Sequence, residues 1–406
     1  MHSLDDLSDA GLVAAVADIV REPRVAPADS FVLHAPLELA ARAALLPHVS
    51  PDQRSNARKR IAEVASAFDA FGPKVAPPPA RDFATIADGA ARLADAIAAG
   101  DLDEVDATAA WLGRGATGRE LRAFLSDVVV PSLAAAAHGT IFLFQMPRVA
   151  PRGELTTELL RPLARELARQ PEWRLRWFEQ RSPAEPQPPE ALYDAFRATP
   201  RLGVPGSDFI HPLMSQVERT GVAADLLALP TANVDFDTAA RVTLRAAALS
   251  MLLEPGDHAP YGWSHCLTLP QAALGVAPWC ADPSVALAVA ATYVVGFRAA
   301  LAHEPLDGTW SPEDPRVDIA TAFDTRPDQA AAAAWHTRAE DLGALKTMLA
   351  SRASAHHDAH LVKYTLACLD AADWDRGAAR LYLAAAARLH GVWVRQDLTT
   401  AAVASA

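Results

Sequence analysis

Apolar residues recur along most of the chain at the three- and four-residue spacing of amphipathic helices, and strand-like patterns are confined to short apolar runs. In the first such segment, residues 5–21, the apolar face consists of Leu12, Val13, Val16 and Ile19. Comparable patterns predict helices at 31–46, 52–71, 83–99, 102–112, 119–144, 235–253, 283–303, 328–349 and 375–394. The pattern therefore predicts an all-α protein.

Alanine dominates an apolar fraction of 51%, in runs such as 134–137, 330–334 and 384–387. Because alanine is the best helix former and lets helices approach closely, this bias strengthens the all-α prediction. A chain of 406 residues has room for one large domain or two average ones. We expect one large domain of many packed helices over residues 1–406, with a proline-rich loop or lid at 182–190.

The formal net charge is −12 and no basic cluster stands out, so nucleic acid and anionic membranes are poor candidate partners. The N-terminal residues resemble neither a signal peptide nor a transit peptide. The most apolar run, 285–301, is interrupted by Arg298 and is short for a membrane span, so we expect a buried core helix there. The three cysteines are widely spaced, which favours reduced thiols and a cytoplasmic location. No pattern indicates an oligomeric state.

Residues 356–364 hold the densest group of chemically active side chains, with three histidines, Asp358 and Lys363. On a helix, His360, Lys363 and Tyr364 would share one face. The simplest interpretation of Lys363 is a side chain that extends its ammonium into water. The alternative is a deprotonated lysine that has reacted with CO2, so that the new carbamate oxygen binds a metal.

Four widely separated histidines lie in apolar surroundings: His34, His138, His265 and His360. Each one alone is more simply interpreted as an ordinary core histidine. Burying four unrelated imidazoles in one helical core would, however, require several hydrogen-bond partners. A shared metal would satisfy them together, because neutral imidazole is the commonest ligand for iron, zinc and copper. We therefore expect the fold to bring the four histidines together around a buried pocket.

Four segments, each containing one of these histidines, resemble the histidine segments and the C-terminal His-x-x-Lys helix of the questin oxidase-like proteins: 34–37, 136–141, 263–268 and 358–364. The resemblance implies an all-helical oxygenase that acts on aromatic polyketides such as anthraquinones in secondary metabolism. The reaction would be ring-cleaving dioxygenation or Baeyer–Villiger-type oxygen insertion. The resemblance also implies a non-haem Fe(II), held by the four histidines and a carbamylated Lys363.

An oxygenase of this kind would take O2 and a small aromatic molecule as substrates, and NADPH only if it is a monooxygenase. His258, His357 and Tyr261 are candidate catalytic residues, the two histidines as groups that move protons. Trp263 and Tyr364 are candidates for contacts with the aromatic substrate.

Two other classes of function stay open. An HD-type metal-dependent phosphohydrolase would use the pair His357-Asp358 together with His336 and either Asp370 or Asp373. A non-catalytic helical protein that binds small molecules would contain ordinary core histidines, and it predicts that the four histidines do not converge.

Overall fold

The computed structural model describes residues 7–25, 31–76, 78–148, 159–180, 185, 187–306, 308, 310–315, 317–323 and 326–404. The all-α prediction is confirmed: these residues contain helices and no strand, and their only β-type pairings are two isolated bridges, Arg24 with Lys74 and Ser132 with Arg174. Of the proline-rich segment 182–190, residues 182–184 and 186 lie outside the described residues, and Pro189 begins a helix.

The helices follow one another along the chain. Those of the N-terminal half are α1 (Asp9–Val20), α2 (Phe31–Leu45), α3 (Arg54–Asp69), α4 (Ile86–Ala99), α5 (Leu102–Gly115), α6 (Gly118–Val129), α7 (His138–Gln145), α9 (Leu160–Arg169) and α10 (Pro189–Arg197). Those of the C-terminal half are α11 (Ile210–Arg219), α12 (Val222–Leu227), α13 (Phe236–Leu253), α14 (Pro260–Val276), α15 (Pro283–Leu301), α16 (Ile319–Phe323), α17 (Pro327–Trp335), α18 (Leu342–Ala355), α19 (Ala359–Trp374) and α20 (Ala379–Ala404).

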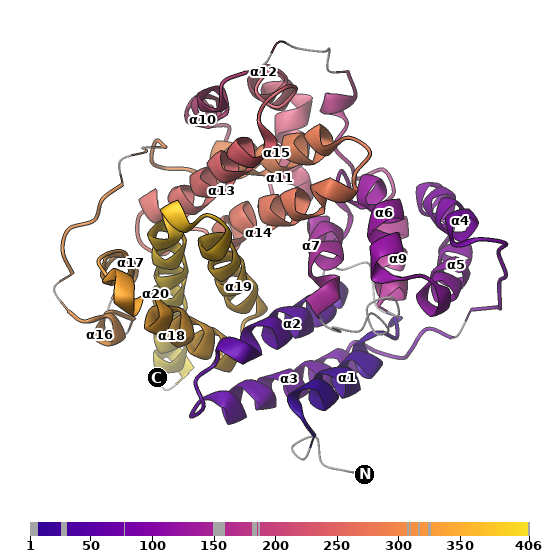
Figure 1. Ribbon diagram of the computed structural model, residues 1–406, viewed down its shortest axis with the longest axis horizontal. Helices are drawn as coiled ribbons and strands as arrows, with labels where there is room; N and C mark the ends of the chain where they lie inside the picture. Colours follow the sequence, from indigo (N-terminus) through magenta and orange to yellow (C-terminus); the bar gives the residue numbers. More distant parts are fainter. Residues whose placement is uncertain are drawn as a thin grey trace.

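Four helices form a closed ring at the centre of the molecule. Helix α2 contacts α7, α7 contacts α14, α14 contacts α19, and α19 returns to α2 (Figure 1). Helices α1 and α3 cover α2 on one side, and α4, α5, α6 and α9 gather beyond α7. Helices α13 and α15 pack against α14, α18 and α20 pack against α19, and α17 packs against α20. The ring therefore joins the beginning, the middle and the end of the chain.

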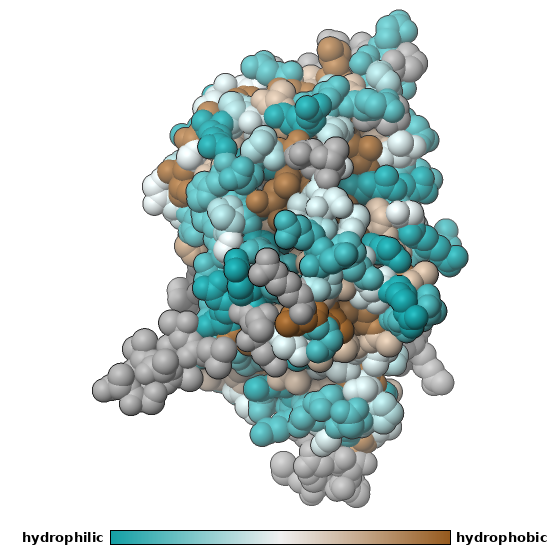
Figure 2. Space-filling model, turned by 90° about the vertical axis from the view of Figure 1, so that its left-hand side faces the viewer, coloured by the Kyte–Doolittle hydropathy of each residue, from teal (hydrophilic) through white to brown (hydrophobic). Residues whose placement is uncertain are grey.

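Helix α15 is the buried core helix that its composition predicted. It is the one helix in the described part of the chain that is long and apolar enough to cross a membrane, and 83% of its most apolar window is buried inside the protein. Arg298 interrupts the apolar run and donates hydrogen bonds to Ser250 Oγ (3.1 Å) and to the Glu304 carbonyl (3.2 Å). On the face shown in Figure 2, apolar residues form separate patches among hydrophilic ones.

The helix predicted for 119–144 is wrong, because the chain breaks it in the middle. Helix α6 ends at Val129, and Pro131 follows, which has no backbone N–H to continue the hydrogen-bonding pattern. The run Ala134–Ala137 then forms a 3-10 turn, η3, and α7 starts at His138. Within this turn Ala135, Ala136 and Ala137 have φ values of 49, 54 and 57°, in the left-handed region. The helix predicted for 328–349 is likewise two helices, α17 and α18.

Helices α17 and α20 meet through alanines and one glycine, Gly391. A Cβ atom at Gly391 would lie 2.8 Å from the Cα atom and 3.2 Å from the nitrogen of Pro327, the first residue of α17. These are backbone atoms, so the only way to relieve the contact is to move one helix. We expect Gly391→Ala to lower the free energy of unfolding by about 1–3 kcal/mol, although alanine is the better helix former.

Urea denaturation of Gly391→Ala and of Gly343→Ala would test this packing. A Cβ atom at Gly343, in α18, meets no atom within 4 Å, so alanine there is expected to leave the stability unchanged or to raise it by up to about 1 kcal/mol. A Gly391→Ala protein as stable as the wild type would contradict the described contact.

Candidate metal centre

The four predicted histidines converge at the centre of the helix ring. His34 comes from α2, His138 is the first residue of α7, His265 lies in α14, and His360 lies in the first turn of α19. The ring centroids are 4.7 Å apart for His34 and His138, 5.2 Å for His138 and His265, 5.1 Å for His265 and His360, and 5.0 Å for His360 and His34. We call these residues the four-histidine cluster. Its members are neighbours in the same cyclic order as their helices.

Two of the imidazoles direct lone pairs at each other. The Nδ1 atoms of His138 and His265 lie 2.8 Å from the carbonyl oxygens of Ala135 and Tyr261, respectively. A carbonyl oxygen only accepts, so each Nδ1 carries the proton, and in a neutral imidazole the Nε2 atom is then a bare acceptor. These two Nε2 atoms are 3.3 Å apart, and the Nε2 atom of His34 is 3.1 Å from that of His138. The contact between the two acceptors needs a cation or a proton to stabilise it.

Two nitrogen separations in the cluster are of the size that a shared metal ion gives. Two nitrogens bound at about 2.0–2.1 Å to the same ion lie roughly 2.9–3.4 Å from each other. The Nε2 separations of 3.1 and 3.3 Å fall within this range. The carbonyl partners of the two Nδ1 atoms also match the way metal-bound histidines are usually oriented by a second hydrogen bond.

Burial keeps the cluster in its uncharged, metal-binding form. It lowers the pKa of His34, His138 and His265 well below the usual value, and it lowers the pKa of His360 less. The positive charge of Lys363 contributes to the lowered pKa of all four imidazoles. The four side chains are therefore neutral at neutral pH, as metal ligands must be.

Lys363 is buried beside the cluster and does not extend into water. Its side chain is 2% exposed, and its Nζ atom has no hydrogen-bond partner in the described part of the chain. Burial lowers the pKa of Lys363 to about 8, although the negative charges of Asp358 and Glu38 raise it. A buried amine without a partner and with a depressed pKa is suited to react with CO2, and the resulting carbamate would add an oxygen ligand to the four nitrogens.

Asp358 joins the cluster to the start of α19. One carboxylate oxygen accepts the backbone N–H groups of His360 (2.7 Å) and Leu361 (3.3 Å) and lies 3.3 Å from Nδ1 of His360. Burial alone would raise the pKa of Asp358, but the hydrogen bonds and charge of His360 lower it overall. The other oxygen accepts the Tyr261 hydroxyl at 3.3 Å. The contact of Asp358 with the His360 ring was not predicted from the sequence, although its position before an apolar helix marks it as a helix cap.

Tyr261 lies at the edge of the cluster that faces solvent. Its ring centroid is 4.7 Å from that of His360 and 5.0 Å from that of Trp393, and half of the residue is exposed. Burial of the hydroxyl and its contact with Asp358 raise the pKa of Tyr261. The structure thus brings this predicted catalytic residue to the site, with a protonated hydroxyl.

The other predicted catalytic residues lie elsewhere. The Nε2 atom of His258 is 2.9 Å from the Leu301 carbonyl, and its ring stacks on His303 at 4.1 Å. His357 is exposed and stacks on His356 at 4.4 Å. The prediction that these two histidines move protons at the cluster is not supported by their contacts, because apolar neighbours in the sequence do not tell which way a loop histidine points.

Trp263 and Tyr364 are core residues, with 1% and 0% of their surfaces exposed. A substrate contact by either side chain stays a prediction.

The residues of the phosphohydrolase hypothesis do not come together. Asp358 contacts His360 of the cluster. Asp370 pairs with Arg148 at 2.6 Å, Asp373 pairs with Lys346, and His336 lies 3.2 Å from Asp314.

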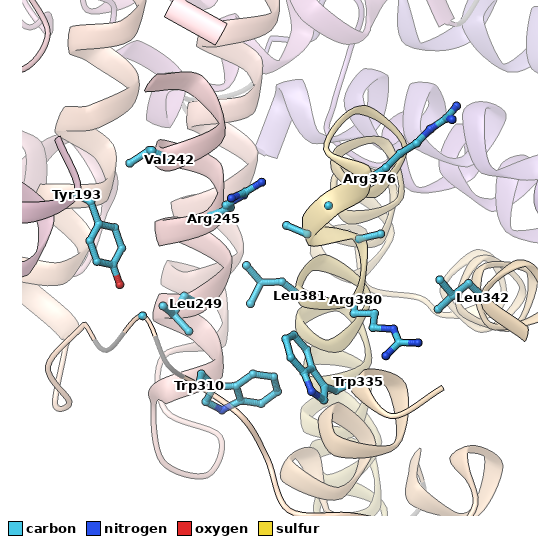
Figure 3. A pocket seen from close by; sticks show the side chains of 14 residues that line it. Tyr193, Val242, Arg245, Leu249, Trp310, Trp335, Leu342, Arg376, Arg380 and Leu381 are labelled. Carbon is cyan, nitrogen blue, oxygen red and sulfur yellow. The ribbon is translucent and has the colours of Figure 1, made fainter. Parts of the chain in front are cut away.

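Two cavities of the described residues are distinct from the four-histidine cluster. One, of about 710 Å³, lies between α13 and the start of α20 and is lined by Trp310, Trp335 and Leu381 (Figure 3). The other, of about 790 Å³, is lined by Ser351, His356 and His390, among others. None of the four histidines of the cluster lines either cavity.

Left-handed alanines precede two of the histidine-bearing helices. Ala137 is the N-cap residue of α7, and Ala259, with φ of 46°, is the N-cap residue of α14. A left-handed conformation costs an L-residue roughly 1–2 kcal/mol, and glycine avoids this cost. The turn before α7 was not predicted, since the run of alanines at 134–137 predicts a continuous helix.

Glycine at position 136 is expected to stabilise the protein. Ala136→Gly removes the steric strain of a left-handed alanine but adds the entropy cost of glycine, for a net gain of roughly 0.5–1 kcal/mol. Ala246→Gly, in the interior of α13, is the matched control and should lower stability by about 1 kcal/mol. Thermal unfolding of both variants measures the difference, and a loss of stability in both would show that position 136 is helical instead.

No family model matches the chain, and neither a search of curated proteins nor a search of solved structures gives a match. The assignment of a function therefore rests on the geometry of the cluster.

Proposed function

We propose that this chain is a non-haem iron-dependent oxygenase that acts on an aromatic or polyketide-type natural product. His34, His138, His265, His360 and a carbamylated Lys363 would hold the metal. The observation that carries the proposal is the 3.3 Å approach of two bare Nε2 atoms, those of His138 and His265, in a fully buried position. Two neutral acceptors in a buried position have no favourable arrangement without a proton or a metal cation between them.

The donor set supports a redox metal and a small substrate. Four imidazoles suit iron, zinc or copper, and a hard carbamate oxygen favours iron over Cu(I). The resemblance of the four histidine segments to questin oxidase-like proteins supports iron and dioxygen. When bound, iron supplies the one-electron chemistry that lets dioxygen react with a closed-shell aromatic ring.

The residues of the chain hold and orient this centre. Asp358 fixes the proton of His360 on Nδ1, which leaves Nε2 of that ring as a ligand. The neutral amine of Lys363 forms a bond from nitrogen to the carbon of CO2 and releases a proton to water, which leaves an anionic carbamate. Tyr261, at the exposed edge, holds Asp358 and presents a hydroxyl to a substrate that enters from solvent.

Metal analysis and oxygen consumption test the proposal. Protein purified without a tag should contain iron or bind Fe(II) anaerobically, and it should then consume O2 with a hydroxylated anthraquinone. Activity without NADPH would indicate ring-cleaving dioxygenation, whereas a requirement for NADPH would indicate a monooxygenase. Full activity of metal-free wild-type protein would refute the iron proposal.

The non-catalytic alternative predicts that the four histidines do not converge, but their rings lie next to one another. The phosphohydrolase alternative requires a group that His336, Asp370 and Asp373 do not form, since their partners are three different side chains. Neither alternative has an observation in its favour. A manganese-dependent phosphatase assay that shows activity would revive the second.

A further inference from the structure

The structure contains a second group of metal-binding side chains, and it includes His258, which the proposed function does not use. Glu254 follows the last residue of α13, His258 lies in the loop before α14, and His303 follows α15. One donor atom of each lies within 4.8 Å of the other two. We propose that Glu254, His258 and His303 bind a divalent cation of the zinc type, independently of the four-histidine cluster.

Glu254 is a buried carboxylate with no lysine or arginine at ion-pair distance in the described residues, and the charge of Arg298 acts on it from farther away. Its side chain is 2% exposed, and its one ion-pair contact in the described residues is with Nδ1 of His303, at 3.8 Å. The backbone N–H groups of His303 (3.0 Å) and Glu304 (3.4 Å) donate to the carboxylate and hold it in place. A buried carboxylate is stable when paired or bound to a metal, so a cation here would complete the pairing.

The two histidines present donor atoms next to this carboxylate. The Nε2–H group of His258 donates to the Leu301 carbonyl at 2.9 Å, which leaves Nδ1 as the lone-pair atom. This is the arrangement that orients metal-bound histidines elsewhere in proteins. The ring of His303 stacks on that of His258 at 4.1 Å, and its side chain is 57% exposed. His303 is therefore free to turn the short distance that brings its nitrogen onto an ion.

The donor set indicates the class of cation. Two imidazole nitrogens and one carboxylate oxygen suit Zn²⁺ and similar ions, whereas Ca²⁺ and Mg²⁺ prefer oxygen alone. Three protein ligands with a solvent-exposed side leave the fourth position of a tetrahedral ion to water. A further group, His356, His357 and Asp397, offers three donors as well, but its carboxylate is 51% exposed and already hydrated. The burial of the Glu254 carboxylate distinguishes the proposed site.

Equilibrium dialysis against Zn²⁺ alone, followed by metal analysis, tests the proposal on the full chain. His303→Ala removes an exposed side chain and should bind one equivalent fewer than the wild type. Glu254→Gln keeps the hydrogen-bond acceptor for the backbone N–H groups but removes the charge, and it should weaken the same equivalent at least tenfold. His336→Ala is the matched control: His336 also lies between a carbonyl, Pro312 (3.0 Å), and a carboxylate, Asp314 (3.2 Å), but has no second histidine. It should bind as much Zn²⁺ as the wild type.

The outcome separates this site from the four-histidine cluster. If His303→Ala binds as many equivalents as the wild type, the proposal is overturned. If His303→Ala and His138→Ala each bind one equivalent of Zn²⁺ fewer than the wild type, both sites bind metal. If only His303→Ala loses an equivalent, the second site stands and the four-histidine cluster does not bind Zn²⁺.

Discussion

Replacing His138 by alanine is expected to abolish metal binding at the four-histidine cluster and to lower oxygenase activity by more than about 100-fold. In the proposed site His138 would be the central ligand, because its Nε2 atom lies 3.1 Å from that of His34 and 3.3 Å from that of His265. Without it, the ion would lose one nitrogen and the fixed orientation of its neighbours. Iron content after anaerobic loading, together with O2 consumption, measures the loss.

His390→Ala provides the control for the loss of a buried histidine as such. His390 is 2% exposed and its Nε2 atom lies 3.1 Å from the Thr365 hydroxyl, outside the cluster. Its truncation should cost a similar amount of stability but leave the iron content unchanged. Equal iron content in His138→Ala and His390→Ala would contradict the assignment of His138 as a ligand.

Replacing Lys363 by methionine is expected to produce the second large effect: iron binding falls at least about tenfold, while the metal-free protein becomes more stable. The stability gain follows because the variant no longer buries an amine that has no hydrogen-bond partner among the described residues. Loss of metal in a variant that unfolds later than the wild type cannot be attributed to misfolding. Chemical denaturation and metal analysis of the same preparations test the expected gain in stability and the expected loss of iron.

The carbamate itself can be tested by pH and by rescue. A lysine whose pKa is about 8 is roughly 10% neutral at pH 7, against well under about 0.1% for an ordinary lysine. At a fixed concentration of dissolved CO2, the rate of CO2-dependent iron loading should therefore rise about tenfold between pH 6 and pH 7 and level off above pH 8. Isotopically labelled bicarbonate should give a carbamate resonance that Lys363→Met lacks. Acetate should restore part of the iron binding of Lys363→Ala. If the rate of iron loading depends on neither bicarbonate nor pH, Lys363 acts as a plain amine.

The helical architecture could be predicted because it depends on local properties. Periodic apolar residues and alanine-rich runs predicted an all-α fold, and α15 was correctly predicted as a buried core helix. The breaks were missed where a local preference is overridden by the tertiary fold. The run 134–137 consists of four alanines, yet it turns through the left-handed region so that the Ala135 carbonyl meets His138.

The site could be predicted in part, for a related reason. A buried histidine must either have its own hydrogen-bond partners or share a metal ion with other histidines. This reasoning selected His34, His138, His265 and His360, which the fold brings together. Loop residues gave no such constraint, and the contacts of His258 and His357 lie outside the cluster. Glu254 carried no visible signal, because a glutamate at the end of a helix is usually solvated, and only the structure shows it buried beside two histidines.

The closed ring of α2, α7, α14 and α19 gives a bound ion a mechanical role in addition to its chemistry. His34 and His138 are 104 residues apart and His138 and His265 are 127 apart, so one ion cross-links segments that span most of the sequence. In the unfolded chain the same links would close very long loops, at a high cost in entropy. Such an ion should bind the assembled fold almost exclusively, and mass action then makes the whole domain, rather than one helix, more resistant to unfolding.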